Sequence, residues 1–146
     1  MSRVFVSGAT GATVYVFSND HCPPHVSARH RGEEWIARVQ FSYLNAEVEL
    51  WSIEPIRNAP TQRAINGLLQ DVSAQLRACR RSWWSIQRTT CLDNQWVLPW
   101  AKGFLEPLLE RVPEAKQIDV ARYDIETDRL WLQFCDGTSS EARIAT

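Results

Sequence analysis

The sequence predicts an α+β fold, in which an antiparallel β-meander packs on one long amphipathic helix and a C-terminal β-hairpin or small meander follows. Three observations lead to this prediction. Apolar and polar residues alternate in short runs before residue 55, and they alternate again after residue 117. Between these runs, over residues 60–88, apolar residues recur every three or four positions instead. A period of two is typical of half-buried strands, and a period near 3.6 is typical of an amphipathic helix.

The N-terminal part predicts a meander of about four or five strands. Valines alternate on both sides of a glycine-containing turn at residues 8–11, and three further alternating runs follow up to residue 53. Turn signals at Arg31-Gly32 and at Asn45 separate these later runs. In the last run, Trp51 falls on the polar side with Glu47 and Glu49. One face of this sheet is therefore expected to be buried.

Residues 60–88 predict one continuous helix. Asn58 can cap its first turn, and Pro60 suits that turn because proline presets a helical φ. Gly67 weakens the pattern, since glycine has a low helix propensity. The apolar stripe runs through Ile65, Leu68, Leu69, Val72, Leu76, Cys79, Trp83 and Ile86.

After this helix, residues 89–100 predict a connector. A short helix is expected from about residue 101 or 104 to residue 112, with Pro107 in its first turn. Alternation then returns and predicts a second small meander with turns near 126–128 and 136–138. The predicted division is a β-meander and helix domain over 1–100, and a short helix with the C-terminal meander over 101–146. We expect the second part to pack on the first as one compact unit.

Composition argues against a strongly charged partner. The chain has 146 residues and a net charge of −1, so no global field favours nucleic acid or a membrane. The charge is uneven, because residues 1–103 carry +3 and residues 104–146 carry −4. No signal peptide or membrane-spanning run is recognisable, and the four cysteines form no Cys-x-x-Cys pair. We therefore expect a cytoplasmic protein with reduced, buried cysteines.

All three histidines lie in "SNDHCPPHVSARH", residues 18–30. His21, His25 and His30 are candidate metal ligands because imidazole binds zinc and similar divalent ions, and Asp20 is a candidate fourth ligand or a group that orients a ring. Two prolines between the first two histidines restrict the backbone. Three interpretations stay open: a structural corner with an Asp–His hydrogen bond, a rigid contact for a protein partner or ligand, and a metal or catalytic site.

The stretch "RRSWW", residues 80–84, is a second candidate binding site. Arg80 and Arg81 could bind phosphate and Trp84 could stack on a base, which is how single-stranded nucleic acid is bound. Trp83 instead continues the apolar stripe of the helix. The alternative interpretation is an ordinary solvated helix end.

The motif "DHCPPH", residues 20–25, resembles domain-of-unknown-function family 4160, a family of small bacterial proteins; the resemblance covers about residues 1–88. One departure is Ser27, which stands where that family often has a further histidine. The tail segment "LWLQFCDGT", residues 130–138, resembles domain-of-unknown-function family 2442. Genes of these two families often neighbour each other and are described as candidate toxin–antitoxin pairs. The resemblance implies that context and no particular reaction.

Two functions follow as hypotheses. The first is a small cytoplasmic bacterial protein that acts as a protein-binding module in a toxin–antitoxin-like or defence-linked locus, without a cofactor. The second is a metal-dependent or histidine-based enzyme that acts on nucleic acid through His21, His25 and His30, with zinc or another divalent metal. The sequence leaves open whether the protein is an enzyme.

Overall fold

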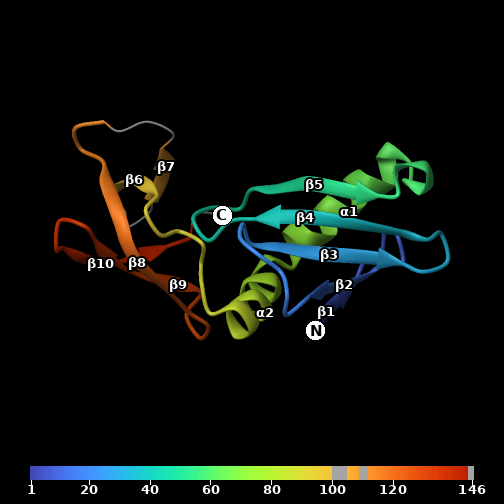
Figure 1. Ribbon diagram of the computed structural model, residues 1–146, viewed down its shortest axis with the longest axis horizontal. Coiled ribbons are helices and arrows are strands. Elements are labelled where there is room, and N and C mark those ends of the chain that lie inside the picture. The colour runs from blue at the N-terminus through green and yellow to red at the C-terminus, as the bar shows by residue number, and fades with distance from the viewer. Residues whose placement is uncertain (100–104, 109–111, 145–146) are drawn as a thin grey trace. The chain divides into compact units, whose positions relative to one another are not determined.

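The computed structural model describes residues 1–99, 105–108 and 112–144. The chain divides into two compact units (Figure 1). Unit 1 comprises Met1–Ser42 and Glu47–Arg88, and unit 2 comprises Tyr43–Ala46 and Thr89–Thr146. Two antiparallel sheets and two α-helices account for most of the described residues, so the α+β class is confirmed. The C-terminal part differs from the expected hairpin or small meander, because it contains a second five-stranded sheet.

The sheet of unit 1 contains its five strands in chain order, each antiparallel to the next. The burial of alternate residues is clearest in β4, where Trp35, Ala37, Val39 and Phe41 are buried and the residues between them are half-buried. The alternation in the sequence therefore identifies the buried face correctly. The strands are β1 (Ser2–Val6), β2 (Thr13–Val16), β3 (His25–His30), β4 (Trp35–Phe41) and β5 (Val48–Glu54).

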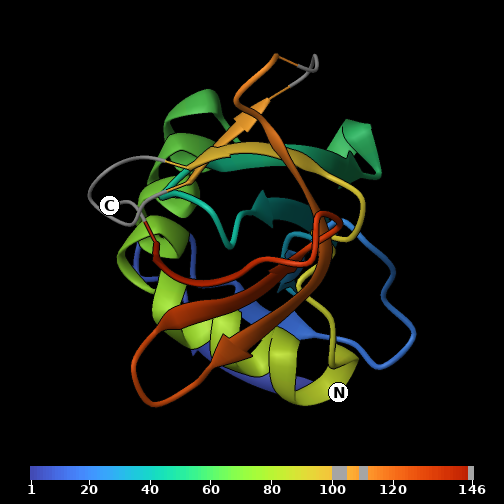
Figure 2. The same ribbon diagram turned by 90° about the vertical axis from the view of Figure 1, so that its left-hand side faces the viewer.

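The stretch predicted as one long helix forms two helices, α1 (Gln62–Ala74) and α2 (Leu76–Gln87). The break is at Gln75, whose φ of −116° and ψ of 22° are not helical. Its N–H donates to the carbonyl oxygen of Val72, three residues back, which tightens the last turn of α1. Both helices lie on the same side of the sheet (Figures 1 and 2). Most of the predicted stripe is buried, and only Leu69 and Ile86 are half-buried.

The sheet of unit 2 has the order β10-β9-β8-β6-β7. Its strands are β6 (Trp96–Pro99), β7 (Leu105–Leu108), β8 (Lys116–Asp124), β9 (Arg129–Phe134) and β10 (Ser139–Arg143). The short helix expected from 101 or 104 to 112 is wrong for residues 105–108, which form β7, and residues 100–104 and 109–111 lie outside the described residues. Pro107 is compatible with β7 because β7 is an edge strand, where a missing N–H costs little.

The cysteines differ from the prediction of four buried thiols. Cys79 is a buried free thiol, whereas Cys135 is free but exposed. Cys22 and Cys91 are disulfide-bonded. None of the described helices has the length and apolar character that a membrane span requires.

Candidate binding surface

The segment 18–30, which contains the three histidines, places one imidazole in the interior of unit 1. His25 is only 3% exposed, and its ring packs between Trp51 and Trp83 at centroid distances of 5.0 and 5.3 Å. Its Nδ1 lies 2.9 Å from the carbonyl oxygen of Pro23, and its Nε2 lies 3.3 Å from a carboxylate oxygen of Asp20. Each ring nitrogen therefore faces an oxygen of the protein itself. The other carboxylate oxygen of Asp20 accepts the N–H of Phe17.

The other two histidines do not join this contact. His21 is exposed, and His30 lies at the opposite end of β3 from His25, roughly 16 Å away along the strand. The ring of His30 stacks on Trp35 with a centroid distance of 5.5 Å, and its Nδ1 accepts the N–H of Glu33. Among the described residues, no three His, Cys, Asp or Glu side chains form a group that could hold a metal ion.

The candidate residues on α2 are separated by burial. Arg80 is buried, and its Nε donates to the carbonyl oxygen of Ser42 at 3.0 Å. Arg81 is exposed, Trp84 is half-buried, and Trp83 is fully buried as the apolar stripe predicted. Arg80 therefore serves the interior of unit 1, and Arg81 and Trp84 alone remain near solvent.

A more prominent surface lies on the sheet of unit 2. In β9 the side chains alternate strictly, so that Leu130, Leu132 and Phe134 are buried and Arg129, Trp131 and Gln133 are exposed. Directly paired residues of antiparallel strands share a face. The exposed face of β9 therefore continues into both neighbouring strands. We call this surface the Trp131 face, and it comprises Val120, Arg122, Asp124, Arg129, Trp131, Gln133, Ser139, Glu141 and Arg143.

Trp131 lies in the middle of this face. Arg122 of β8 is its direct neighbour on one side, and Glu141 of β10 is its direct neighbour on the other. The indole is 56% exposed, which is unusual for so large an apolar side chain. An exposed tryptophan on a central strand, with charged residues on both sides, is a typical arrangement for a contact surface.

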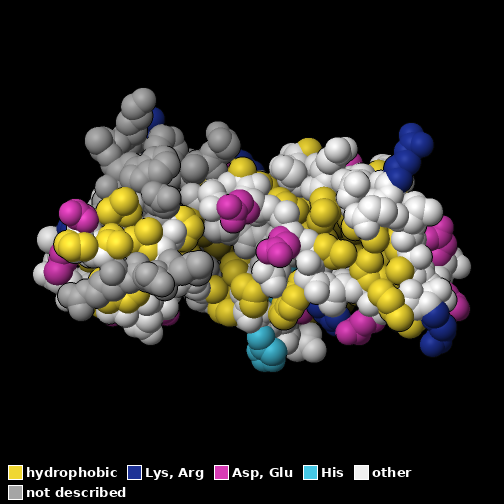
Figure 3. Space-filling view, turned by 90° about the horizontal axis from the view of Figure 1, so that it is seen from above, with side chains coloured by type: hydrophobic (Ala, Val, Ile, Leu, Met, Phe, Trp, Pro, Cys, Tyr) yellow, Lys and Arg dark blue, Asp and Glu magenta, His cyan; other side chains and the backbone are white. Residues whose placement is uncertain are grey.

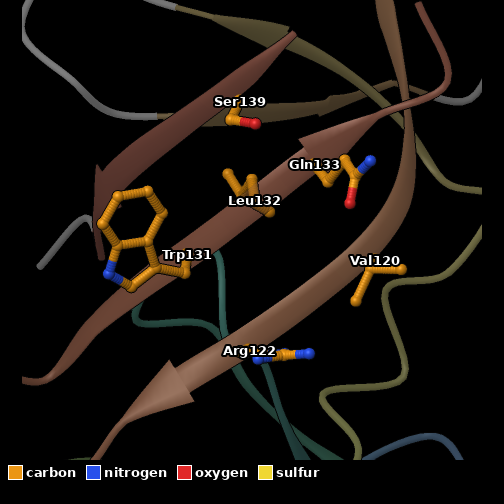
Figure 4. A pocket seen from close by; sticks show the side chains of 6 residues that line it. All are labelled: Val120, Arg122, Trp131, Leu132, Gln133 and Ser139. Carbon is orange, nitrogen blue, oxygen red and sulfur yellow. The ribbon is translucent and has the colours of Figure 1, made fainter. Parts of the chain in front are cut away.

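A shallow hollow of about 490 Å³ lies beside the indole (Figure 4). Trp131 and Val120 supply its exposed apolar lining, and Val120 is 41% exposed. Its polar lining comes from Arg122, Gln133 and Ser139. Figure 4 shows these side chains on three adjacent strands. Among the described residues that line it, none has a carboxylate and Arg122 alone has a positive charge, so these residues combine an apolar wall with one guanidinium.

The charges on the Trp131 face are unequally compensated. Arg129 forms an ion pair with Glu141 at 3.1 Å. Within the part of the chain that the structure describes, Arg122 and Arg143 make no hydrogen bond and no ion pair. The guanidinium of Arg122 is therefore available to an incoming acceptor at the border of the hollow.

The sequence interpretation did not single out Trp131. The signal was present, because the alternation in "RLWLQF" places this tryptophan on the side of Arg129 and Gln133 rather than with the leucines. Trp51, which is also exposed, was placed on the polar side of its strand, and the structure gives it an exposed fraction of 47%.

Comparisons with known proteins identify no relative. No protein-family model matches the chain, and neither a curated protein nor a solved structure matches it. The resemblance to the two families of unknown function therefore stays a prediction.

Proposed function

We propose that the protein is a non-enzymatic protein-binding module, and that its binding site is the part of the Trp131 face that lines the hollow beside the indole. The observation that carries the proposal is the position of Trp131, which is exposed on a central strand directly opposite Arg122. Arg122 has no ion-pair partner among the described residues. Tryptophan and arginine are the residues most enriched among those that dominate binding energy at protein interfaces. The surrounding polar residues resemble the polar rim of such an interface.

The charge of unit 2 supports a protein partner over nucleic acid. Six basic and ten acidic residues give unit 2 a net charge of −4. A polyanion would be repelled by this charge, and its binding depends on several simultaneous phosphate contacts. On the face shown in Figure 3, the visible lysine and arginine side chains also lie apart from one another rather than in one patch.

The biological setting rests on the resemblance alone. A bacterial, cytoplasmic protein that binds the product of a neighbouring gene in a toxin–antitoxin-like or defence-linked locus is consistent with such a module. The alternative, a histidine-based or metal-dependent enzyme on nucleic acid, has less support because each ring nitrogen of His25 faces an oxygen of the protein itself and His30 lies at the other end of its strand.

A random-peptide display library tests the proposal on the purified full chain. Peptides selected on the wild-type protein are compared on Trp131→Ala and on Trp51→Ala, which removes another half-exposed tryptophan from a different unit. We expect a class of peptides that binds Trp51→Ala normally and binds Trp131→Ala at least tenfold more weakly. A selected pool in which no peptide depends on Trp131 would contradict the proposal.

A further inference from the structure

We infer that the segment bound at the Trp131 face is an extended peptide with a carboxylate at one position and an aliphatic side chain two positions away. This inference rests on the proposed function and adds the chemistry of the partner. The carboxylate pairs with Arg122, and the aliphatic side chain lies in the hollow against Trp131 and Val120.

The carboxylate follows from charge. Arg122 lines the hollow and makes no ion pair or hydrogen bond among the described residues. The nearest acidic side chain on the same row of the sheet, Glu141, lies beyond the indole and already pairs with Arg129. A guanidinium has a rigid fork of donors that matches a carboxylate, so an acidic side chain completes its bonding.

The aliphatic side chain follows from the apolar wall. Val120 and Trp131 are both substantially exposed, and covering them removes apolar surface from water. Gln133 and Ser139 lie on the same row as Val120 and can bond to the backbone of a bound segment. The hollow therefore accepts an uncharged side chain beside Val120, Gln133 and Ser139, and a negatively charged side chain beside Arg122.

The spacing follows from strand geometry. Val120 and Arg122 are two residues apart on β8 and share the exposed face, which separates them by roughly 7 Å. Side chains two positions apart in an extended peptide also share one face and have the same separation. A segment of the type Asp-x-Val or Glu-x-Leu fits both positions at once, whereas adjacent residues point to opposite sides.

One carboxylate is favoured over a phosphate group or a nucleic acid. The net charge of −4 on unit 2 opposes an approaching polyanion, while a single negative charge is compensated by Arg122. Arg143, which also has no ion-pair partner among the described residues, is on a different row of this face and does not line the hollow. It therefore serves as a matched control.

The experiment uses three synthetic pentapeptides with blocked ends and the full-length ¹⁵N-labelled protein. Their sequences are Gly-Asp-Ser-Val-Gly, the same peptide with Asn for Asp, and Gly-Ser-Asp-Val-Gly, in which the two side chains are adjacent. Binding is followed through the indole Nε1–H signal of Trp131. We expect the first peptide to bind at least fivefold more tightly than either of the others. In Arg122→Gln, the Asp and Asn peptides should bind with equal affinity. In Arg143→Gln, the ratio of their affinities should stay within twofold of the wild-type ratio.

Equal affinity for the Asp and Asn peptides, an advantage that survives in Arg122→Gln, or no shift with any peptide would overturn this inference. Tighter binding of hexathymidylate to the same signals would also overturn it. The library selection judges the proposed function separately. Selected peptides that depend on Trp131 but contain no acidic residue would support the proposed function and would contradict the inferred carboxylate. A library with no Trp131-dependent peptide would refute both.

Discussion

His25 and Asp20 face each other across the loop between β2 and β3, with 3.3 Å between the imidazole Nε2 and the nearer carboxylate oxygen. Both side chains are nearly excluded from solvent, at 3% and 12% exposed. The segment 18–30, which contains all three histidines, thus contributes one imidazole to the packing of unit 1. His21, four positions earlier, is exposed. Mutation of His25 is therefore expected to affect stability much more than mutation of His21.

His25→Ala should lower the free energy of unfolding by about 3 kcal/mol, because it leaves the carboxylate of Asp20 without its partner and opens a gap between Trp51 and Trp83. His21→Ala is the control and should change stability by less than about 0.5 kcal/mol. Urea denaturation measures both. Similar stabilities for the two variants would show that the buried contact does not hold the loop.

Gly67→Ala should destabilise the protein even though alanine favours a helix by about 1 kcal/mol. A Cβ at this position of α1 would lie 2.6 Å from the Cβ of Ala9. The loop of Ala9 cannot retreat freely, because Asp71 accepts hydrogen bonds from the hydroxyl of Ser7 and from the N–H of Ala9. We expect a net loss of about 1–2 kcal/mol.

The second substitution Ala9→Gly removes the colliding methyl group. The double variant should therefore recover most of the lost stability, whereas Ala9→Gly alone should have a small effect. Chemical denaturation of the four proteins gives the coupling between the two sites. If Gly67→Ala by itself is more stable than the wild type, the close approach of the loop to α1 is not a constraint.

These examples show what the sequence could and could not predict. The strands of unit 1 follow from alternation between neighbouring residues, which is a local signal. The stripe of the helical region was also correct, but Gln75 has good helix propensity and nothing nearby in the sequence marks the break. Four residues such as 105–108 are too few to distinguish a strand from a helix by period.

The site depends even more on distant contacts. The sequence made Arg80 a candidate phosphate ligand. In the structure its Nε instead donates a hydrogen bond to the carbonyl oxygen of Ser42, 38 residues away. The Trp131 face required the register of three strands, which brings Arg122 and Glu141 to the two sides of one indole. Alternation alone could place Trp131 on the polar side of its strand, but it could not identify these neighbours.

The buried thiol of Cys79 should make stability fall at alkaline pH. Desolvation by burial is the main cause that raises the pKa of Cys79 from 9.0 to about 12. Between these values the unfolded chain loses this proton and the folded protein keeps it, so the unfolded state is favoured as pH rises. The slope should be about 1.4 kcal/mol per pH unit.

Comparison with Cys79→Ala isolates this effect, because the other groups that titrate at high pH are shared. The difference in unfolding free energy between wild type and variant should be constant below pH 9 and should shift against the wild type above it. Denaturation at pH 8 and pH 10 provides the measurement. A difference that is the same at both values would mean that Cys79 does not titrate as its burial predicts.

The turn between β9 and β10 should make the protein less stable as pH falls, whereas Cys79 should make it less stable as pH rises. The side-chain hydroxyl of Thr138, followed by its backbone N–H, lowers the pKa of Asp136. The stabilisation from this carboxylate is present above the ordinary aspartate pKa and is lost as pH falls through the lowered value. Thr138→Val removes the main cause, so the pKa of Asp136 should rise toward its ordinary range.

Carboxyl ¹³C NMR titration measures that pKa directly. Asp124 provides an internal control, because its pKa is lowered chiefly by the hydroxyl of Thr127 in a different turn. Its titration should not change in Thr138→Val. A pKa of Asp136 that stays low in the variant would assign the effect to the backbone N–H of Thr138 and to Lys116 instead.

Replacement of a buried tryptophan should cost much more stability than replacement of the exposed Trp131. Trp83 of α2 is fully buried and contacts the rings of His25 and Phe41, so Trp83→Ala should cost about 4 kcal/mol. Trp131 is 56% exposed, and Trp131→Ala should cost less than about 1 kcal/mol through the loss of cross-strand contacts. Guanidinium denaturation followed by far-ultraviolet circular dichroism measures both without depending on tryptophan fluorescence. If Trp131→Ala destabilised the fold as much as Trp83→Ala, the indole would belong to the hydrophobic core, and the Trp131 face could not be a free binding surface.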